Sequence, residues 1–162
     1  MSRSQQRHSN PAFNAGRRTK PHVLSADYIV GLIDGEGSFC VYLRPPVKKT
    51  WNTRVECHFY LKMRKDELPL IQKVKKFFGC GRISYQKEYR DNQQDNYRYQ
   101  VSNIHDLISV IIPFFKENGL HSTPRKKDFD LFCKVVDCVH KGIHQQRNVI
   151  TQIKKWKSQM HM

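Results

Sequence analysis

A carboxylate flanked by glycines is the first group in this sequence that could do chemistry. Glu36 lies in the run Gly-Leu-Ile-Asp-Gly-Glu-Gly over residues 31–37, where the glycines predict that a helix ends. The helix dipole disfavours a carboxylate at that end, so stability does not explain this residue. Carboxylate oxygens suit Mg²⁺, and bound metal ions can activate water for phosphodiester hydrolysis.

Two glycines of the same helix indicate where a second carboxylate could come from. Gly31 and Gly35 are four residues apart and share one helix face, where small residues let a second helix backbone approach closely. The chain carries one such helix, so a second copy related by a two-fold axis would supply the other. The two Glu36 carboxylates would then repel each other unless a cation lies between them.

Local signals predict the helix that positions these residues. Ser25 can cap its first amides, Asp27 in the first turn suits the dipole, and Leu24 and Ile29 stand at the positions of a hydrophobic staple. Glycine ends this helix at residue 35 or 37.

Alternating apolar and polar residues predict two pairs of strands, over about 38–44 and 54–64 and over about 82–86 and 96–101. Further helices are predicted over 66–78, 104–116, 126–141 and 146–159. This order predicts an α+β domain of αββαββα type, with a four-stranded antiparallel sheet covered by helices on one face. The domain is expected to span residues 24–162, after a basic and disordered N-terminal arm over 1–23.

The wet face of this sheet is suited to reading DNA. It contains one acid, Glu56, whereas a generic wet face usually carries more acids. Arginine, glutamine and asparagine can each make two hydrogen bonds to a base edge in the major groove. The residues predicted on this face are Ser38, Tyr42, Arg44, Arg54, Glu56, His58, Tyr60, Lys62, Arg64, Arg82, Ser84, Gln86, Asn96, Arg98 and Gln100.

The overall charge agrees with a polyanionic partner. Lysine and arginine number 29 against 14 acids, a formal net charge of +15, and nucleic acid is the commonest partner of such a protein. The five cysteines are odd in number and form no Cys-x-x-Cys pair, which argues against a disulfide framework or a cysteine-rich zinc site. No apolar run approaches the roughly 20 residues of a membrane span.

Residues 28–39, Tyr-Ile-Val-Gly-Leu-Ile-Asp-Gly-Glu-Gly-Ser-Phe, resemble the signature of the LAGLIDADG homing endonucleases, whose nine positions fall on Ile29–Gly37. The stretches Phe-Gly-Cys-Gly-Arg-Ile at 78–83 and Lys-Lys-Asp-Phe at 126–129 are also similar, so the likeness covers about residues 25–160. It implies a single-motif homodimer that cuts a long, pseudo-palindromic double-stranded DNA site. The two sheets would form a saddle along the groove, with Mg²⁺ as cofactor and Mn²⁺ or Ca²⁺ able to replace it for binding.

The resemblance also assigns roles to residues. Glu36 and Gly35 are expected at the metal, and Ile29, Gly31, Leu32 and Gly35 at the dimer interface. Similar family positions carry a lysine that polarises the attacking water or steadies the phosphate. In this sequence Lys126 is the first choice for that role and Arg125 is the second. The alternative that these residues form an ordinary phosphate-contacting or solvated basic run remains open. One departure falls at Met63, where a polar residue that holds water near the metal is expected.

Two other functions suit the same features. An RNA maturase that helps its own intron splice would use the same basic face, and so would a DNA-binding protein that does not cut. The resemblance places the protein in an organelle, mitochondrion or chloroplast, or in a prokaryotic cytoplasm. The polar N-terminus lacks the apolar segment of a secretory signal.

Overall fold

The computed structural model describes residues 23–48, 52–91 and 93–162. The αββαββα order predicted from the sequence is confirmed, and the helices predicted over 126–141 and 146–159 follow it as the last two helices. The elements are α1 (Ala26–Glu36), β1 (Gly37–Arg44), β2 (Arg54–Arg64), α2 (Leu68–Phe78), β3 (Arg82–Gln86), β4 (Asn96–Val101), α3 (Ile104–Asp106), α4 (Ile112–Asn118), α5 (Thr123–His140) and α6 (Arg147–Ser158). Except for Val23, the expected N-terminal arm lies outside the described residues.

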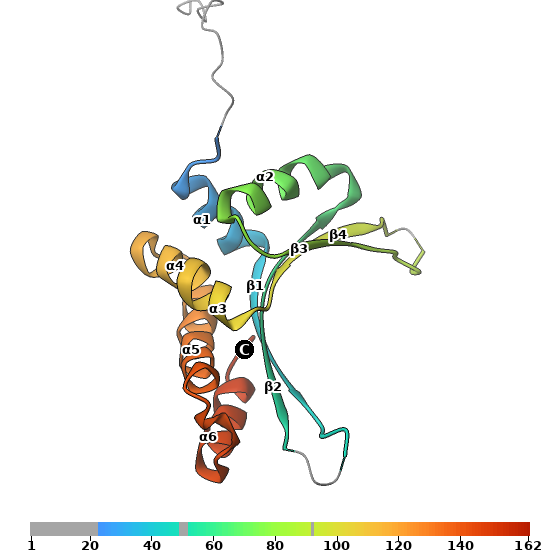
Figure 1. Cartoon of the computed structure of the whole chain (residues 1–162). Helices are drawn as coiled ribbons and strands as arrows, with labels where there is room; N and C mark the ends of the chain where they lie inside the picture. The colour runs from blue at the N-terminus through green and yellow to red at the C-terminus, as the bar shows by residue number, and fades with distance from the viewer. Residues whose placement is uncertain (1–22, 49–51, 92) are drawn as a thin grey trace, which may run out of the picture.

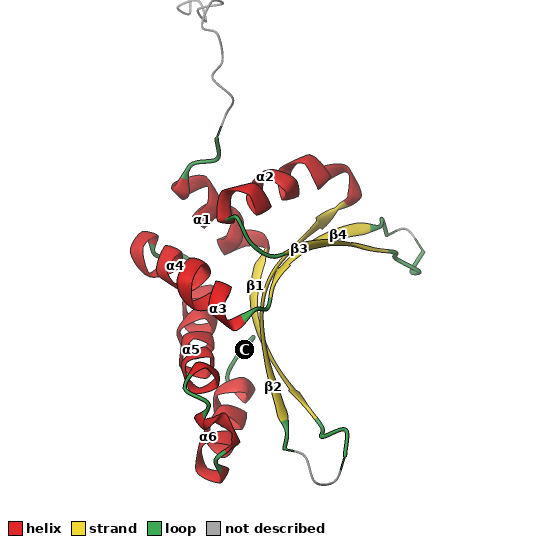
Figure 2. Cartoon of the chain, viewed as in Figure 1, coloured by secondary structure: helices red, strands yellow, loops and turns green. Residues whose placement is uncertain are grey.

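The four strands form one antiparallel sheet in the order β1-β2-β4-β3. The helices lie on one side of this sheet, which curves, and the β3–β4 hairpin extends away from them (Figures 1 and 2). The opposite side is uncovered by any described helix, and we call it the open face. This arrangement confirms the predicted class, a sheet with one buried and one wet side.

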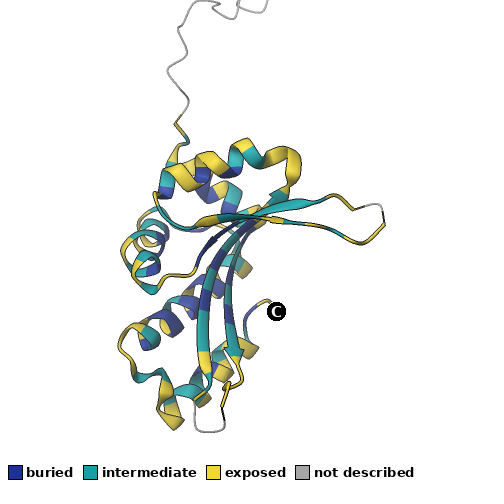
Figure 3. Cartoon of the chain, turned by 45° about the vertical axis from the view of Figure 1, so that its right-hand side comes forward, coloured by how far each residue is buried: buried dark blue, intermediate teal, exposed yellow. Residues whose placement is uncertain are grey.

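The core lies between the sheet and the helices, and its centre is aromatic. Phe39 of β1 is fully buried, with its ring centroid 5.3 Å from Phe59, 5.6 Å from Phe115 and 5.4 Å from Phe132. Buried residues alternate with exposed or half-buried ones along much of β1 and β2 (Figure 3). Strand alternation therefore separates the residues that hold the fold from those available to a partner.

The start and the end of α1 follow from its sequence. Tyr28 N donates to Ser25 Oγ at 3.2 Å, which confirms Ser25 as the cap. Gly37 ends the helix and is the first residue of β1, so no loop separates the two elements. A Cβ at Gly37 would lie 2.5 Å from Ile33 Cγ2 and 2.8 Å from Ile33 O, so this close approach requires glycine.

Two helix boundaries differ from the sequence prediction. The helix expected over 104–116 is a run of α3, a π-helical turn at Leu107–Ile111 and α4, which ends at Asn118. The helix α5 begins at Thr123, three residues before the predicted start. Pro124 suits the first turn of a helix, because the amide that proline lacks has no partner there.

Candidate active site and nucleic-acid interface

One face of α1 is free to receive another helix. Gly31 and Gly35 are exposed, Tyr28 is 46% exposed and Leu32 is half-buried. A Cβ added at either glycine would meet no described residue within 4 Å, so the packing of the described part of the chain does not require glycine at those positions. The prediction for Ile29 is wrong: its side chain is fully buried in the core of its own chain and is absent from this face.

Glu36 ends this helix in an exposed position. The last turn of α1 has no basic residue, and no hydrogen bond or ion pair occupies the Glu36 carboxylate within the described part of the chain. An exposed carboxylate beside the backbone oxygens at a helix end offers the hard oxygen donors that Mg²⁺ prefers. The donor chemistry at this position therefore fits a divalent metal ion.

Asp34 ties the end of α1 to the start of α5. Its carboxylate accepts hydrogen bonds from His121 N at 2.8 Å and from Ser122 N at 3.2 Å. These amides immediately precede the turn of α5 that carries Arg125 and Lys126. Asp34 thus links the end of α1, which carries Glu36, to the start of α5, which carries Arg125 and Lys126. The sequence did not predict this link, because Asp34 was considered only as one position of the motif.

Replacing Asp34 by alanine is expected to lower the free energy of unfolding by about 1–3 kcal/mol, because two backbone amides lose a charged acceptor. Urea unfolding of the purified chain measures this change. The control Asp130→Ala removes an exposed aspartate from α5 and should change stability by less than about 0.5 kcal/mol. Equal stability of the Asp34→Ala variant and the wild type would show that the link is not stabilising.

The two basic candidates differ in exposure. Lys126 is exposed, whereas Arg125 is half-buried and its Nε atom is buried without a hydrogen-bond partner among the described residues. A buried polar group without a partner is uncommon and calls for an explanation, such as a water or an ion. Lys126 is free to contact a ligand directly, and Arg125 lies one position closer to the residues that Asp34 holds.

The polar residues predicted on the wet face do share the open face. The register pairs Tyr60 with Gln100 and Gln100 with Arg82, while Lys62 pairs with Arg98 and Arg98 with Ser84. On the other half of the sheet, Ser38, Tyr42 and Arg44 lie opposite Tyr60, Glu56 and Arg54. The predicted positions therefore form one continuous surface across four strands.

The acid on this surface is paired with bases. Glu56 lies 3.3 Å from Arg44 Nε and 3.8 Å from Arg54 Nη2, so its charge is balanced locally. The Arg98 guanidinium lies over the Tyr60 ring at 4.7 Å, which holds the arginine against the sheet. The open face therefore presents a cationic surface despite this acid.

One predicted DNA contact is corrected by burial. Gln100 is 7% exposed, and its Nε2 lies 3.1 Å from His58 Nδ1, to which Tyr60 Oη is also hydrogen-bonded at 2.6 Å. Gln100 therefore positions neighbouring side chains and is too buried to read a base itself. Burial is also the main cause that lowers the pKa of His58, so this ring is mostly neutral at neutral pH.

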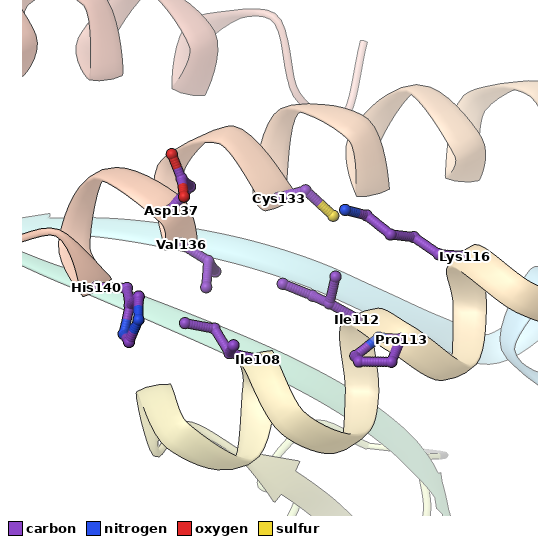
Figure 4. Close-up of a pocket in the computed structure, with 8 residues that line it drawn as sticks. All are labelled: Ile108, Ile112, Pro113, Lys116, Cys133, Val136, Asp137 and His140. Atoms are coloured by element: carbon purple, nitrogen blue, oxygen red, sulfur yellow. The ribbon is translucent and has the colours of Figure 1, made fainter.

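Two further features lie away from the open face. Met63 is half-buried and packs against the core, on the side of the sheet that alternation predicts. A hollow of about 290 Å³ between α4 and α5 has an apolar floor that includes Ile108, Ile112 and Val136 (Figure 4). This hollow lies among the helices, away from the open face, and contributes none of the residues described above.

The family model described as LAGLIDADG endonuclease matches residues 29–136 of this sequence. The chain belongs to this family. The LAGLIDADG signature falls on α1 and the first residue of β1, so its last acidic position, Glu36, is the exposed end of the helix. Among the helices of the described residues, none combines the length and apolar character needed to cross a membrane.

Curated proteins named as endonucleases are similar over most of the chain. A probable intron-encoded DNA endonuclease of Mycosarcoma maydis is 32% identical over 67% of this chain and 35% of its own length. Homing endonuclease I-ApeII of Aeropyrum pernix is 27% identical over 70% of the chain and 63% of its own length. The chain spans between 26% and 63% of the lengths of the curated relatives it matches.

Solved LAGLIDADG structures share the fold. The homing endonuclease I-TnaI is 27% identical with a TM-score of 0.73, over 87% of this chain and 90% of its own. The I-SmaMI homing endonuclease bound to cleaved DNA is 20% identical with a TM-score of 0.76, over 90% of this chain and 46% of its own. This chain therefore corresponds to nearly all of the first fold and about half of the second.

Proposed function

We propose that this chain is a site-specific homing endonuclease that cuts both strands of a long, pseudo-palindromic DNA site as a homodimer. The observation that carries the proposal is the position of Glu36, exposed and unpaired within the described residues, at the end of the helix whose free face carries Gly31 and Gly35. An enzyme that uses a metal ion to hydrolyse the phosphodiesters of DNA needs such an oxygen donor next to its DNA surface.

The open face is the DNA surface in this proposal. Arg54, Arg82 and Lys62 are exposed on it, and side chains of this kind contact phosphates and base edges. The net charge of +15 supports a nucleic-acid partner, and relatives from the same family are named as DNA or homing endonucleases. Arg125 and Lys126 would contact the phosphate or the attacking water.

Mg²⁺ is the proposed cofactor, with Mn²⁺ or Ca²⁺ able to replace it for binding. Glu36 and the backbone at Gly35 would hold the ion. When bound, the metal ion supplies an activated water and stabilises the leaving oxygen. A structure of the fold neighbour I-SmaMI with uncleaved DNA was determined in the presence of calcium ions, which supports a role for a divalent metal ion.

A homodimer completes the site in this proposal. The free face of α1, made of Tyr28, Gly31, Leu32 and Gly35, would pack against the same face of a second copy. A two-fold axis at this contact would bring the two Glu36 residues close together. The correspondence of this chain to about half of the I-SmaMI fold supports two such units per active enzyme.

Selective cleavage of a DNA library tests the proposed function. The wild-type chain is incubated with candidate intron-insertion sites in Mg²⁺, in Ca²⁺ and in EDTA, and cut ends are sequenced. Cleavage of one site family in Mg²⁺, binding without cleavage in Ca²⁺, and no cleavage in EDTA are expected. Selective binding that never leads to cutting would instead identify a DNA-binding protein, and rescue of intron splicing would identify a maturase.

The compartment follows from the same proposal. An intron-encoded protein of this family would act in a mitochondrion, in a chloroplast or in a prokaryotic cytoplasm, where its DNA target lies. The curated relatives come from fungi and from an archaeon, which agrees with a mitochondrial or a prokaryotic setting.

A further inference from the structure

A cysteine, a histidine and an aspartate meet at the first strand of the sheet. Cys40 Sγ lies 3.8 Å from His161 Nε2, and His161 Nδ1 lies 3.0 Å from Asp128 Oδ2. The three residues come from β1, the segment after α6, and α5. Figure 1 shows that this last segment returns from α6 toward the sheet.

The arrangement is held by more than the side chains. His161 N donates to the other Asp128 oxygen, Oδ1, at 2.9 Å, so the carboxylate fixes both the backbone and the ring. Asp128 is 4% exposed. Met160, which directly precedes His161, is 6% exposed, so its side chain anchors the segment after α6 in the core. Asp128 therefore orients an imidazole that is itself 47% exposed.

This geometry assigns a role to each nitrogen of His161. The Asp128 carboxylate, 3.0 Å from Nδ1, favours the proton on that nitrogen, and this tautomer leaves the lone pair of Nε2 toward the Cys40 sulfur. Ser38 Oγ lies 3.1 Å from the same sulfur and can donate to a thiolate. A nucleophile, a base within reach and a third group that orients the base form the usual arrangement of an activated thiol.

We propose that Cys40 is a nucleophilic thiol that undergoes exchange with small disulfides such as oxidised glutathione. The thiol proton passes from Sγ to His161 Nε2, and the Cys40 thiolate attacks one sulfur of the disulfide. A Cys40–glutathione S–S bond forms, the original S–S bond breaks, and the second glutathione leaves as a thiolate that recovers the proton. No other oxidant is needed, because the incoming disulfide is reduced as Cys40 is oxidised.

The other four cysteines lie in different surroundings. Burial raises the pKa of Cys57 to about 12 and of Cys133 to about 12, and it also raises the pKa of Cys80 and of Cys138. The thiolate is the reacting species, so these four should exchange slowly in the folded chain. They provide an internal reference for the rate at Cys40.

Glutathione attached to Cys40 would lie on the open face of the sheet. Cys40 pairs with His58 across β1 and β2, so its side chain belongs to the open face together with Ser38 and Tyr60. A glutathione attached there would add bulk and negative charge to the surface on which DNA is proposed to lie. This consequence, unlike the exchange itself, rests on the proposed function.

Peptide mapping by mass spectrometry during incubation of the reduced full chain with oxidised glutathione tests the proposal. Cys40 should form the mixed disulfide at least about tenfold faster than any other cysteine. His161→Ala should slow Cys40 about tenfold, and added imidazole should restore much of the rate. His140→Ala, which removes an exposed histidine from α5, should have no effect. Equal rates at all five cysteines, or an unchanged rate in His161→Ala, would overturn it.

Two further variants separate positioning from folding. Asp128→Asn should slow Cys40 and resist rescue by imidazole, because His161 still occupies the site but is wrongly oriented. Cys40→Ser should bind DNA in the presence of oxidised glutathione, whereas the wild type should lose affinity until dithiothreitol is added. A reduced wild-type chain that never binds DNA would contradict the proposed function alone, since the thiol kinetics are measured without DNA.

Discussion

Glu36→Gln is expected to reduce DNA cleavage in Mg²⁺ by at least about 1000-fold, which corresponds to about 4 kcal/mol of activation barrier. The amide loses the negative charge that attracts the metal ion and one of the two oxygens that could bind it. Glu36 is exposed and has no partner among the described residues, so the fold should be unaffected. Cleavage rates under single-turnover conditions, measured on the site found by library selection, provide the comparison.

Comparing the DNA affinities of Glu36→Gln and Arg98→Ala separates an effect on the metal ion from an effect on DNA binding. Glu36→Gln should keep its affinity for the target in Ca²⁺ within about threefold, because the carboxylate faces the metal and not the bases. Arg98→Ala, by contrast, should weaken target binding by about 1–3 kcal/mol, since it removes a cationic side chain from the open face. Full cleavage by Glu36→Gln would refute the metal site, and equal loss of target and scrambled DNA by Arg98→Ala would refute base reading there.

Gly31→Leu is expected to weaken self-association by at least about 100-fold, or about 2.7 kcal/mol. Within the part of a single chain that the structure describes, a Cβ at this position meets nothing within 4 Å, and leucine favours a helix by close to 1 kcal/mol over glycine. The monomer should therefore fold at least as stably as the wild type. In a dimer whose helices meet at Gly31, the leucine would force the two backbones apart, and cleavage should fall with the dimer population.

Sedimentation velocity between about 0.1 and 50 μM measures the association. Gln72→Leu is the matched control, because it places the same side chain on the exposed surface of α2 and should leave the dimer intact. A Gly31→Leu variant that dimerises as tightly as the wild type would exclude the glycine face as the interface. Loss of stability in urea would instead show that α1 packs differently within the chain.

The local features of this fold could be predicted from the sequence, whereas the features that depend on tertiary packing could not. Ser25 as a cap and the alternation of β2 are decided by neighbouring residues, so both were predicted correctly. Ile29 was misplaced because the motif was treated as one block. Helical geometry separates Ile29 and Ile33, which face the core, from the exposed Gly31 and Gly35.

Contacts between distant residues account for the rest. Gln100 has a polar type in a wet position of its strand, yet side chains from β2, 42 residues away, cover it. Asp34 contacts residues 87 and 88 positions away, and Cys40 is separated from His161 by 121. A single sequence contains no periodic signal at such separations, so these partners become visible only in the folded chain.

The direct passage from α1 into β1 has a mechanical consequence. Glu36 is the last residue of the helix and Gly37 the first of the strand, and Gly37 is locked against Ile33. The Glu36 carboxylate and strand β1, which begins the open face, should therefore move as one rigid unit. In the proposed enzyme, a DNA target of the wrong sequence that tilts the sheet would also displace Glu36. A mismatch on the open face would therefore misalign the metal-binding carboxylate and slow cleavage.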